Sequence, residues 1–249
     1  VEIESLYDLS TQHVFSPTNW LHIMSSSAVV LFDLDGTLAD TALDLCHTMN
    51  VLLKRHGRAP VSDDQMRPMV GAGARKIMER AFAATGAPAD ENQLDLLFEE
   101  FLEYYGSHIA DHTTLFPGVL DQLEALRARA INLAICTNKA ERLTHQLLDT
   151  LEIAHFFPVV IGGDTLDVRK PDPRHLTEAI VRLGGDLGGA VMVGDSGPDI
   201  RAAQAAAIPS ICVTFGYTDI AAPDLGADHL IDHFDALPDA LKTLRPEHF

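Results

Sequence analysis

The sequence predicts an α/β protein with a doubly wound parallel sheet and a small all-helical domain inserted after the first strand. Residues 28–32 form an unbroken apolar run, which suits a parallel strand buried on both faces. From residue 116 onward, apolar runs alternate with segments of helical periodicity, as in βαβ units with right-handed crossovers. Between residues 61 and 109 the pattern is helical, without a convincing strand.

The expected elements follow in a regular order after that first strand. A helix is predicted over 40–55, ending at Gly57, and two helical stretches over 76–84 and 91–105 fall in the insertion. Beyond the insertion we expect helix 119–129, strand 131–136, helix 141–151, strand 159–161, helix 174–183, strand 190–193, helix 198–206, strand 210–213, a short strand near 229–231 and a helix over 237–244.

These patterns divide the chain into three parts. Residues 28–40 and 115–249 are predicted to form the α/β core, and residues 41–114 the helical insertion. Residues 1–27 differ in composition from the rest, and we expect a flexible or loosely packed appendage there. A short amphipathic element around Trp20 that docks on the core is the alternative.

Composition limits the class of protein and its partners. The chain has 249 residues, of which 47% are hydrophobic, and its formal net charge is −18. An acidic field of this size disfavours nucleic acids and anionic membranes as partners, and an anionic substrate would need local cations or a metal ion. Three unpatterned cysteines, no apolar stretch long enough to span a membrane and no signal-peptide pattern predict a cytoplasmic protein. These features do not distinguish a monomer from a homodimer, and both stay open.

Polar side chains stand where the predicted strands end. Because the carboxyl ends of parallel strands meet at one edge of a sheet, these groups are expected to converge in one cleft. Clustered carboxylates are unfavourable without a cation, and oxygen ligands favour Mg²⁺. The residues alone therefore predict a magnesium-assisted site for an anionic ester, with phosphate the natural choice. The converging residues are Asp33, Asp35, Thr137, Asn138, Lys170, Asp195 and Asp199.

Four motifs in this order resemble those of the haloacid dehalogenase superfamily. They are D-L-D-G-T-L at 33–38, T-N-K at 137–139, K-P-D-P at 170–173 and G-D-S-x-x-D at 194–199. The resemblance implies a Rossmann-like core, and the helical insertion resembles the cap domain of that superfamily. Within it the chain is similar to the phosphoglycolate phosphatase group, from which Ala207 departs where a glycine is usual. A left-handed backbone there would cost about 1 kcal/mol.

The resemblance also implies catalytic roles. Asp33 would attack phosphorus and form an aspartyl-phosphate, while Asp35 would protonate the leaving alkoxide and then activate water. Thr137 and Asn138 would hold phosphoryl oxygens, and Lys170 would neutralise charge and position the nucleophile.

The same resemblance implies a metal site. Mg²⁺ would be bound by the Asp33 carboxylate, the Asp35 backbone carbonyl and Asp195, with Asp199 an additional or outer ligand. Movement of the cap is expected to gate the site, with hinges near 40–41 and 114–118.

A glycine-rich turn in the insertion is a candidate substrate-binding element. Gly71 and Gly73 precede a cationic first helical turn with Arg75 and Lys76. In the resembling family the corresponding loop faces the core site, so its amides or these cations could bind a substrate carboxylate. A surface turn with solvated charges is the alternative.

The preferred function is a Mg²⁺-dependent phosphoric monoester hydrolase acting on a small phosphorylated metabolite, with 2-phosphoglycolate as the preferred substrate. The alternatives are a phosphatase for another small phosphate, a phosphomutase on the same fold, and a catalytically silent binding protein. The presence together of Asp33, Asp35, Lys170 and Asp195 argues against the silent protein.

Overall fold

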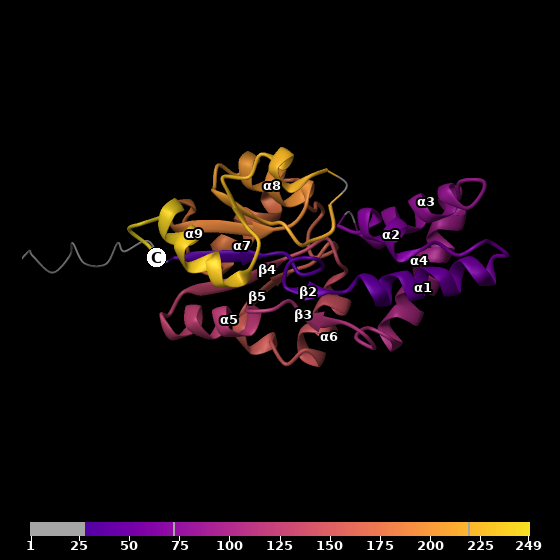
Figure 1. The fold of residues 1–249 in the computed structure, drawn as a ribbon, viewed down its shortest axis with the longest axis horizontal. Helices are drawn as coiled ribbons and strands as arrows, with labels where there is room; N and C mark the ends of the chain where they lie inside the picture. The colour runs from indigo at the N-terminus through magenta and orange to yellow at the C-terminus, as the bar shows by residue number, and fades with distance from the viewer. Residues whose placement is uncertain (1–27, 72, 219) are drawn as a thin grey trace, which may run out of the picture.

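The computed structural model describes residues 28–71, 73–218 and 220–249, and the prediction for residues 1–27 lies outside the described residues. A six-stranded parallel sheet forms the centre of the larger lobe (Figure 1). Its strands, in spatial order, are β5 (Val159–Ile161), β4 (Asn132–Cys136), β1 (Val29–Phe32), β6 (Ala190–Gly194), β7 (Ser210–Val213) and β8 (His229–Ile231). The chain winds outward in both directions from β1, which confirms the predicted doubly wound sheet.

Strand β1 is at the centre because both of its faces are apolar. Val30 and Phe32 join the larger hydrophobic cluster, whereas Val29 and Leu31 join the smaller one on the opposite face. All four side chains are completely buried. The larger cluster also contains apolar residues of α5 (Val119–Ala128), α6 (Glu141–Thr150) and α9 (Leu237–Leu244), and the smaller one those of α7 (Arg174–Arg182) and α8 (Gly197–Ala205).

Four helices form a second, smaller lobe, which lies beyond the carboxyl ends of the strands (Figure 1). This helical lobe comprises α1 (Ala42–Arg55), α2 (Asp63–Met66), α3 (Ala74–Ala84) and α4 (Glu91–Ser107). Capping boxes begin α2 at Ser62 and α4 at Asp90, where each cap side chain accepts a hydrogen bond from the backbone N–H three residues later. The short helix α2 was not predicted, because four residues are too few to show helical periodicity.

A two-stranded antiparallel ribbon joins the lobes. It pairs β2 (Ala39–Asp40) with β3 (Thr114–Leu115), so the chain leaves the core and returns to it at adjacent points. The ribbon coincides with the predicted limits of the insertion, while the division into domains and the hinge movement stay predictions. Among the described residues, no helix is long and apolar enough to cross a membrane.

The backbone at Ala207 is left-handed, with φ at 56°. It follows α8, and the N–H groups of Ala207 and Ile208 donate to the carbonyls of Gln204 and Ala203, at 3.1 Å each. This hydrogen-bond pattern is a Schellman motif, in which glycine is the usual residue at the left-handed position because a Cβ is unfavourable there.

We expect Ala207→Gly to raise the free energy of unfolding by up to about 1 kcal/mol, because it removes this steric cost. Ala205→Gly, at an exposed position of the same helix, should lower it by a similar amount. Urea denaturation of both variants checks the pair, and equal destabilisation by the two substitutions would contradict the prediction.

Candidate active site

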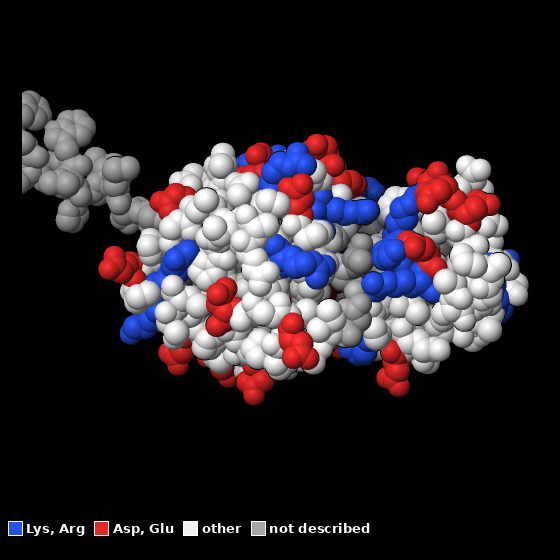
Figure 2. Space-filling model, turned by 90° about the horizontal axis from the view of Figure 1, so that it is seen from above, with Lys and Arg blue, Asp and Glu red and all other residues white. Residues whose placement is uncertain are grey.

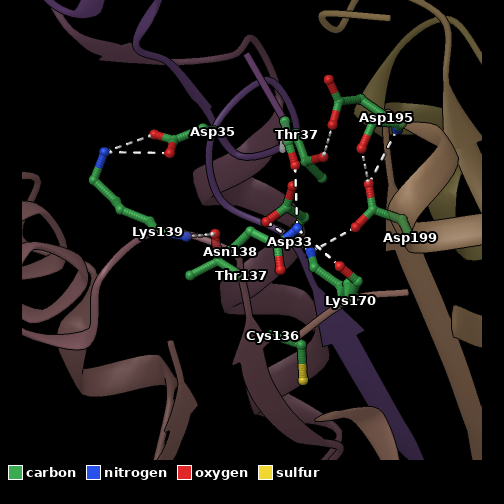
Figure 3. A network of polar contacts seen from close by, with 12 residues as sticks. Asp33, Asp35, Thr37, Cys136, Thr137, Asn138, Lys139, Lys170, Asp195 and Asp199 are labelled. Carbon is green, nitrogen blue, oxygen red and sulfur yellow. Dashed lines mark hydrogen bonds and ion pairs between the residues drawn. The ribbon is translucent and has the colours of Figure 1, made fainter. Parts of the chain in front are cut away.

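A buried lysine bridges two carboxylates at the carboxyl end of the sheet (Figure 3). Lys170 Nζ lies 3.0 Å from Asp33 Oδ1 and 2.5 Å from Asp199 Oδ1. Asp33 follows β1 directly and continues its pairing, since its backbone N–H donates to the Val193 carbonyl. All three charged side chains are buried, as the predicted convergence of strand ends requires.

Asp199 is fully engaged by protein groups. Its second oxygen, Oδ2, accepts hydrogen bonds from the Ser196 N–H at 3.0 Å and the Ser196 hydroxyl at 2.7 Å. These contacts cap the start of α8, while the other oxygen holds Lys170. Direct ligation of a metal by Asp199, one of the predicted options, would require one of these contacts to open.

Asp195 is held by two loops. Its Oδ1 accepts a hydrogen bond from the Thr37 hydroxyl at 3.3 Å, and its Oδ2 accepts one from the Tyr217 backbone N–H at 2.6 Å. The loops approach closely because Gly36 and Gly216 lack side chains. A Cβ at those positions would lie 2.4 and 2.2 Å from atoms of the Asp195 side chain.

The three carboxylates form a compact acidic cluster. One oxygen from each of Asp33, Asp195 and Asp199 lies within 4.8 Å of the others. Burial raises the pKa of Asp33 to about 6, with the Lys170 ammonium acting in the opposite direction. Burial also raises the pKa of Asp195 well above its ordinary range, and the Asp199 and Asp33 charges add to this effect.

This cluster fits a divalent cation. Asp33 Oδ1 is buried and accepts no hydrogen bond with satisfactory geometry, although Lys170 lies beside it. Three anionic oxygen donors around a single ammonium leave an excess of negative charge, and hard oxygen donors suit a cation such as Mg²⁺.

The loop after β4 brings Thr137 and Asn138 to the same site. Thr137 continues the sheet by donating its N–H to the Ile161 carbonyl at 2.9 Å. The Asn138 side-chain amide donates to the Lys170 carbonyl at 3.2 Å and to the Gly71 carbonyl at 3.3 Å. Asn138 therefore connects the loop that carries Lys170 with the turn in the helical lobe.

Asp35 points away from the acidic cluster (Figure 3). Its two carboxylate oxygens accept hydrogen bonds from Lys139 Nζ at 3.0 and 3.2 Å, and that ammonium also donates to the Tyr105 hydroxyl at 2.8 Å. The metal contact predicted for Asp35 is its backbone carbonyl, and this orientation of the side chain does not engage that carbonyl. Lys139 was not among the predicted site residues, although it is the third residue of the T-N-K motif.

The predicted glycine turn contacts the core. A Cβ at Gly73 would lie 3.2 Å from the Asn138 carbonyl oxygen, and one at Gly71 would lie 3.4 Å from the Ser196 side chain. Both glycines have positive φ, at 90° and 96°. The expectation that this turn faces the core site therefore agrees with the structure, while a contact with substrate stays a prediction.

The two cations that follow the turn are engaged elsewhere. Arg75 pairs with Glu91 and Asp95 of α4, at 2.6 Å each, and Lys76 pairs with Glu79 at 2.7 Å. Acidic residues of the helical lobe already hold both cations, and the predicted contact of either one with a substrate carboxylate stays a prediction. Their predicted substrate contact would require these ion pairs to open.

A cavity of about 190 Å³ lies between the lobes. Asp33, Asp35 and Thr137 line it on the core side, and the face from the helical lobe is largely apolar. Arg75 and Arg169 also line it. Arg75 is held by Glu91 and Asp95, whereas in the described part of the chain the Arg169 guanidinium has neither an ion pair nor a hydrogen bond. Figure 2 shows Lys and Arg side chains on both sides of the junction between the lobes, although the chain as a whole is acidic.

A class of hydrolases combines such a parallel sheet with carboxylates at the strand ends and a buried lysine. A family model described as haloacid dehalogenase-like hydrolase matches residues 30–213, and the chain belongs to that family. The recognition made from the four motifs is thereby confirmed.

Particular relatives within the family are phosphatases by name. The chain is 43% identical to phosphoglycolate phosphatase of Caulobacter vibrioides, over 88% of this chain and 92% of that protein. It is 44% identical to phosphoglycolate phosphatase of Agrobacterium fabrum, over 86% of this chain and 92% of the relative. A crystal structure of a predicted phosphoglycolate phosphatase from Haemophilus somnus superposes with a TM-score of 0.81 at 29% identity, covering 87% and 99% of the two chains.

We expect Asp195→Asn to abolish stabilisation by Mg²⁺ without destabilising the metal-free protein. The amide oxygen can still accept the Tyr217 N–H, and the amide NH2 can donate to the Thr37 hydroxyl oxygen, while a buried charge is removed. Wild-type protein should gain about 2.7 kcal/mol at a metal concentration of about 100 Kd. Thermal denaturation with and without Mg²⁺ measures both effects. The exposed Asp149→Asn should keep the metal response, and an unchanged response in Asp195→Asn would refute the assignment.

Proposed function

We propose that this protein is a Mg²⁺-dependent phosphatase that hydrolyses 2-phosphoglycolate to glycolate and phosphate. The observation that carries the proposal is the buried Asp33 carboxylate, which Lys170 holds at 3.0 Å within the acidic cluster. This arrangement suits a nucleophile that attacks the phosphorus of a phosphoryl group whose oxygens carry negative charge. The identities of 43% and 44% to two phosphoglycolate phosphatases support the choice of substrate.

The reaction proceeds in two displacements at phosphorus. The Asp33 carboxylate attacks the phosphoryl group, the bond from phosphorus to the ester oxygen breaks, and Asp35 donates a proton to the departing alkoxide. Water then attacks the phosphorus of the aspartyl-phosphate and transfers a proton to Asp35, which releases phosphate and restores Asp33. Thr137 and Asn138 hold the phosphoryl oxygens, which requires the Asn138 amide to release one of its two backbone carbonyls, and Lys170 neutralises charge and positions Asp33.

Asp33, Asp195 and the Asp35 backbone carbonyl would hold the Mg²⁺, which would neutralise charge on the phosphoryl group. Asp199 acts from outside this ligand set. It anchors Lys170 through one oxygen and the start of α8 through the other.

The glycolate part of the substrate would occupy the cavity between the lobes. Asp35 lines the cavity and can reach a leaving oxygen there. We assign the substrate carboxylate to Arg169, which faces the cavity without a partner in the described residues. Arg75 already donates to two carboxylates and is the less suitable cation.

We expect phosphate release from 2-phosphoglycolate to depend on Mg²⁺ and to stop on addition of excess chelator. In a panel of small phosphomonoesters, 2-phosphoglycolate should give the highest kcat/KM, and Asp33→Asn should abolish turnover of every member. If another ester gave the highest kcat/KM, the identity of the substrate would change and the proposed mechanism would stand. Absence of release from all members, with folded and metal-loaded protein, would refute the proposed function.

Arg169→Ala should raise the KM for 2-phosphoglycolate by about ten-fold or more, because a charge-assisted hydrogen bond contributes about 1.5–3 kcal/mol. Its KM for 4-nitrophenyl phosphate, which has no carboxylate, should change little. Steady-state kinetics of Arg169→Ala and Arg75→Ala on both substrates provides the comparison. If only Arg75→Ala raised the KM for 2-phosphoglycolate without raising that for 4-nitrophenyl phosphate, the substrate carboxylate would have to be assigned to Arg75 instead of Arg169.

A further inference from the structure

We infer that Lys139 and Tyr105 are positioning residues that orient the Asp35 carboxyl group toward the leaving group. The inference deepens the proposed function and rests on it. It gives a role to the buried Lys139 ammonium, which otherwise takes no part in the two displacements at phosphorus.

Hydrogen bonds link the three side chains, with the Lys139 ammonium between the Asp35 carboxylate and the Tyr105 hydroxyl. Lys139 Nζ lies 3.0 and 3.2 Å from the two oxygens of Asp35 and 2.8 Å from the Tyr105 hydroxyl. The side chains of Lys139 and Asp35 are 5% and 13% exposed, and Tyr105 is fully buried. Contacts to both carboxylate oxygens restrict rotation of that group far more than one exposed ion pair would.

The contact spans the two lobes. Lys139 belongs to the loop after β4, whereas Tyr105 belongs to α4 of the helical lobe. On the side of α4 that lines the cavity, Phe98, Phe101 and Leu102 are apolar, and Tyr105 supplies a hydroxyl. A phenylalanine would fill the same volume, so the hydroxyl is the feature that requires explanation.

Electrostatics explain why the hydroxyl is present. A buried ammonium is unfavourable unless its N–H groups are satisfied, and the Tyr105 oxygen accepts one of them. Burial raises the pKa of Tyr105 to about 12, against the opposing charge of Lys139, so the hydroxyl stays neutral near pH 7. The Lys139 ammonium also lies 4.4 Å from the centre of the Tyr105 ring, which adds a cation–π contact.

The two lysines of the site hold different carboxylates. Lys170 holds the nucleophile Asp33, and Lys139 holds Asp35. Because Tyr105 comes from the helical lobe, the Asp35 carboxyl is fully oriented only while that lobe lies on the core. Proton transfer to the leaving group is thereby restricted to the state in which the lobe covers the substrate.

The test exploits the fact that good leaving groups need no protonation. We propose measuring kcat/KM for 2-phosphoglycolate and for a series of substituted phenyl phosphates whose phenols differ in acidity. The proteins are wild type, Tyr105→Phe and Lys139→Met. Tyr104→Phe is the matched control, since it removes from the same helix a hydroxyl that contacts His47 instead.

Both positioning variants should lose about ten-fold or more in kcat/KM on 2-phosphoglycolate and on the least acidic phenols, and little on 4-nitrophenyl phosphate. The dependence of log kcat/KM on leaving-group acidity should therefore become steeper, while Tyr104→Phe keeps the wild-type slope. Lys139→Arg, which preserves the cation, should recover part of the loss.

Equal losses across the series, or no loss, would overturn the inference, because a purely structural role does not distinguish leaving groups. Tyr105→Phe keeps the packing of the buried ring and decides the question if Lys139→Met fails to fold. A wild-type protein that cleaves none of these esters would instead overturn the proposed function, so the two failures are distinguishable.

Discussion

The ammonium of Lys170 lies between Asp33 and Asp199, and the rest of the site depends on this buried pairing. Removing a charged group from water is costly, so such a lysine is stable only where carboxylates are fixed around it. The sheet provides that fixation, because β1 and β6 are neighbours and their carboxyl ends deliver Asp33 and Asp195 side by side. The glycines at 36 and 216 follow from the same requirement, since they allow the backbone to close over Asp195.

Charge is distributed unevenly over the molecule. The formal net charge of −18 opposes the approach of an anionic substrate, yet Lys139 and Arg169 line the cavity between the lobes, and Lys170 is buried beside Asp33. Beyond roughly 8–10 Å, surface charges are largely screened at physiological ionic strength, whereas buried charges are not. The charges that line the cavity therefore act there more strongly than the distant surface charges, and the acidic exterior affects mainly encounter and solubility.

The sheet and the core motifs were predictable because their signals are local. A fully apolar strand followed at once by Asp33 places that carboxylate at the end of a buried strand, and the same reasoning holds for Asp195. The left-handed conformation at Ala207 was considered through the resemblance alone, because a glycine is usual at that position in the family. The partners of Arg75 were not predictable, because α3 and α4 are joined by a turn whose geometry the spacing of residues does not reveal. The contact of Lys139 with Tyr105 joins residues 34 positions apart across two lobes, which no periodicity encodes.

The ribbon of β2 and β3 has a consequence for how such a protein can change over evolutionary time. The chain departs from the core and rejoins it at residues paired directly across the ribbon, Asp40 with Thr114 and Ala39 with Leu115. A segment attached in this way can be lengthened, shortened or replaced while the six strands keep their order, since its two ends need only remain adjacent. Residues of the inserted stretch that line the cavity can then diverge, while the phosphoryl chemistry is inherited unchanged with the sheet.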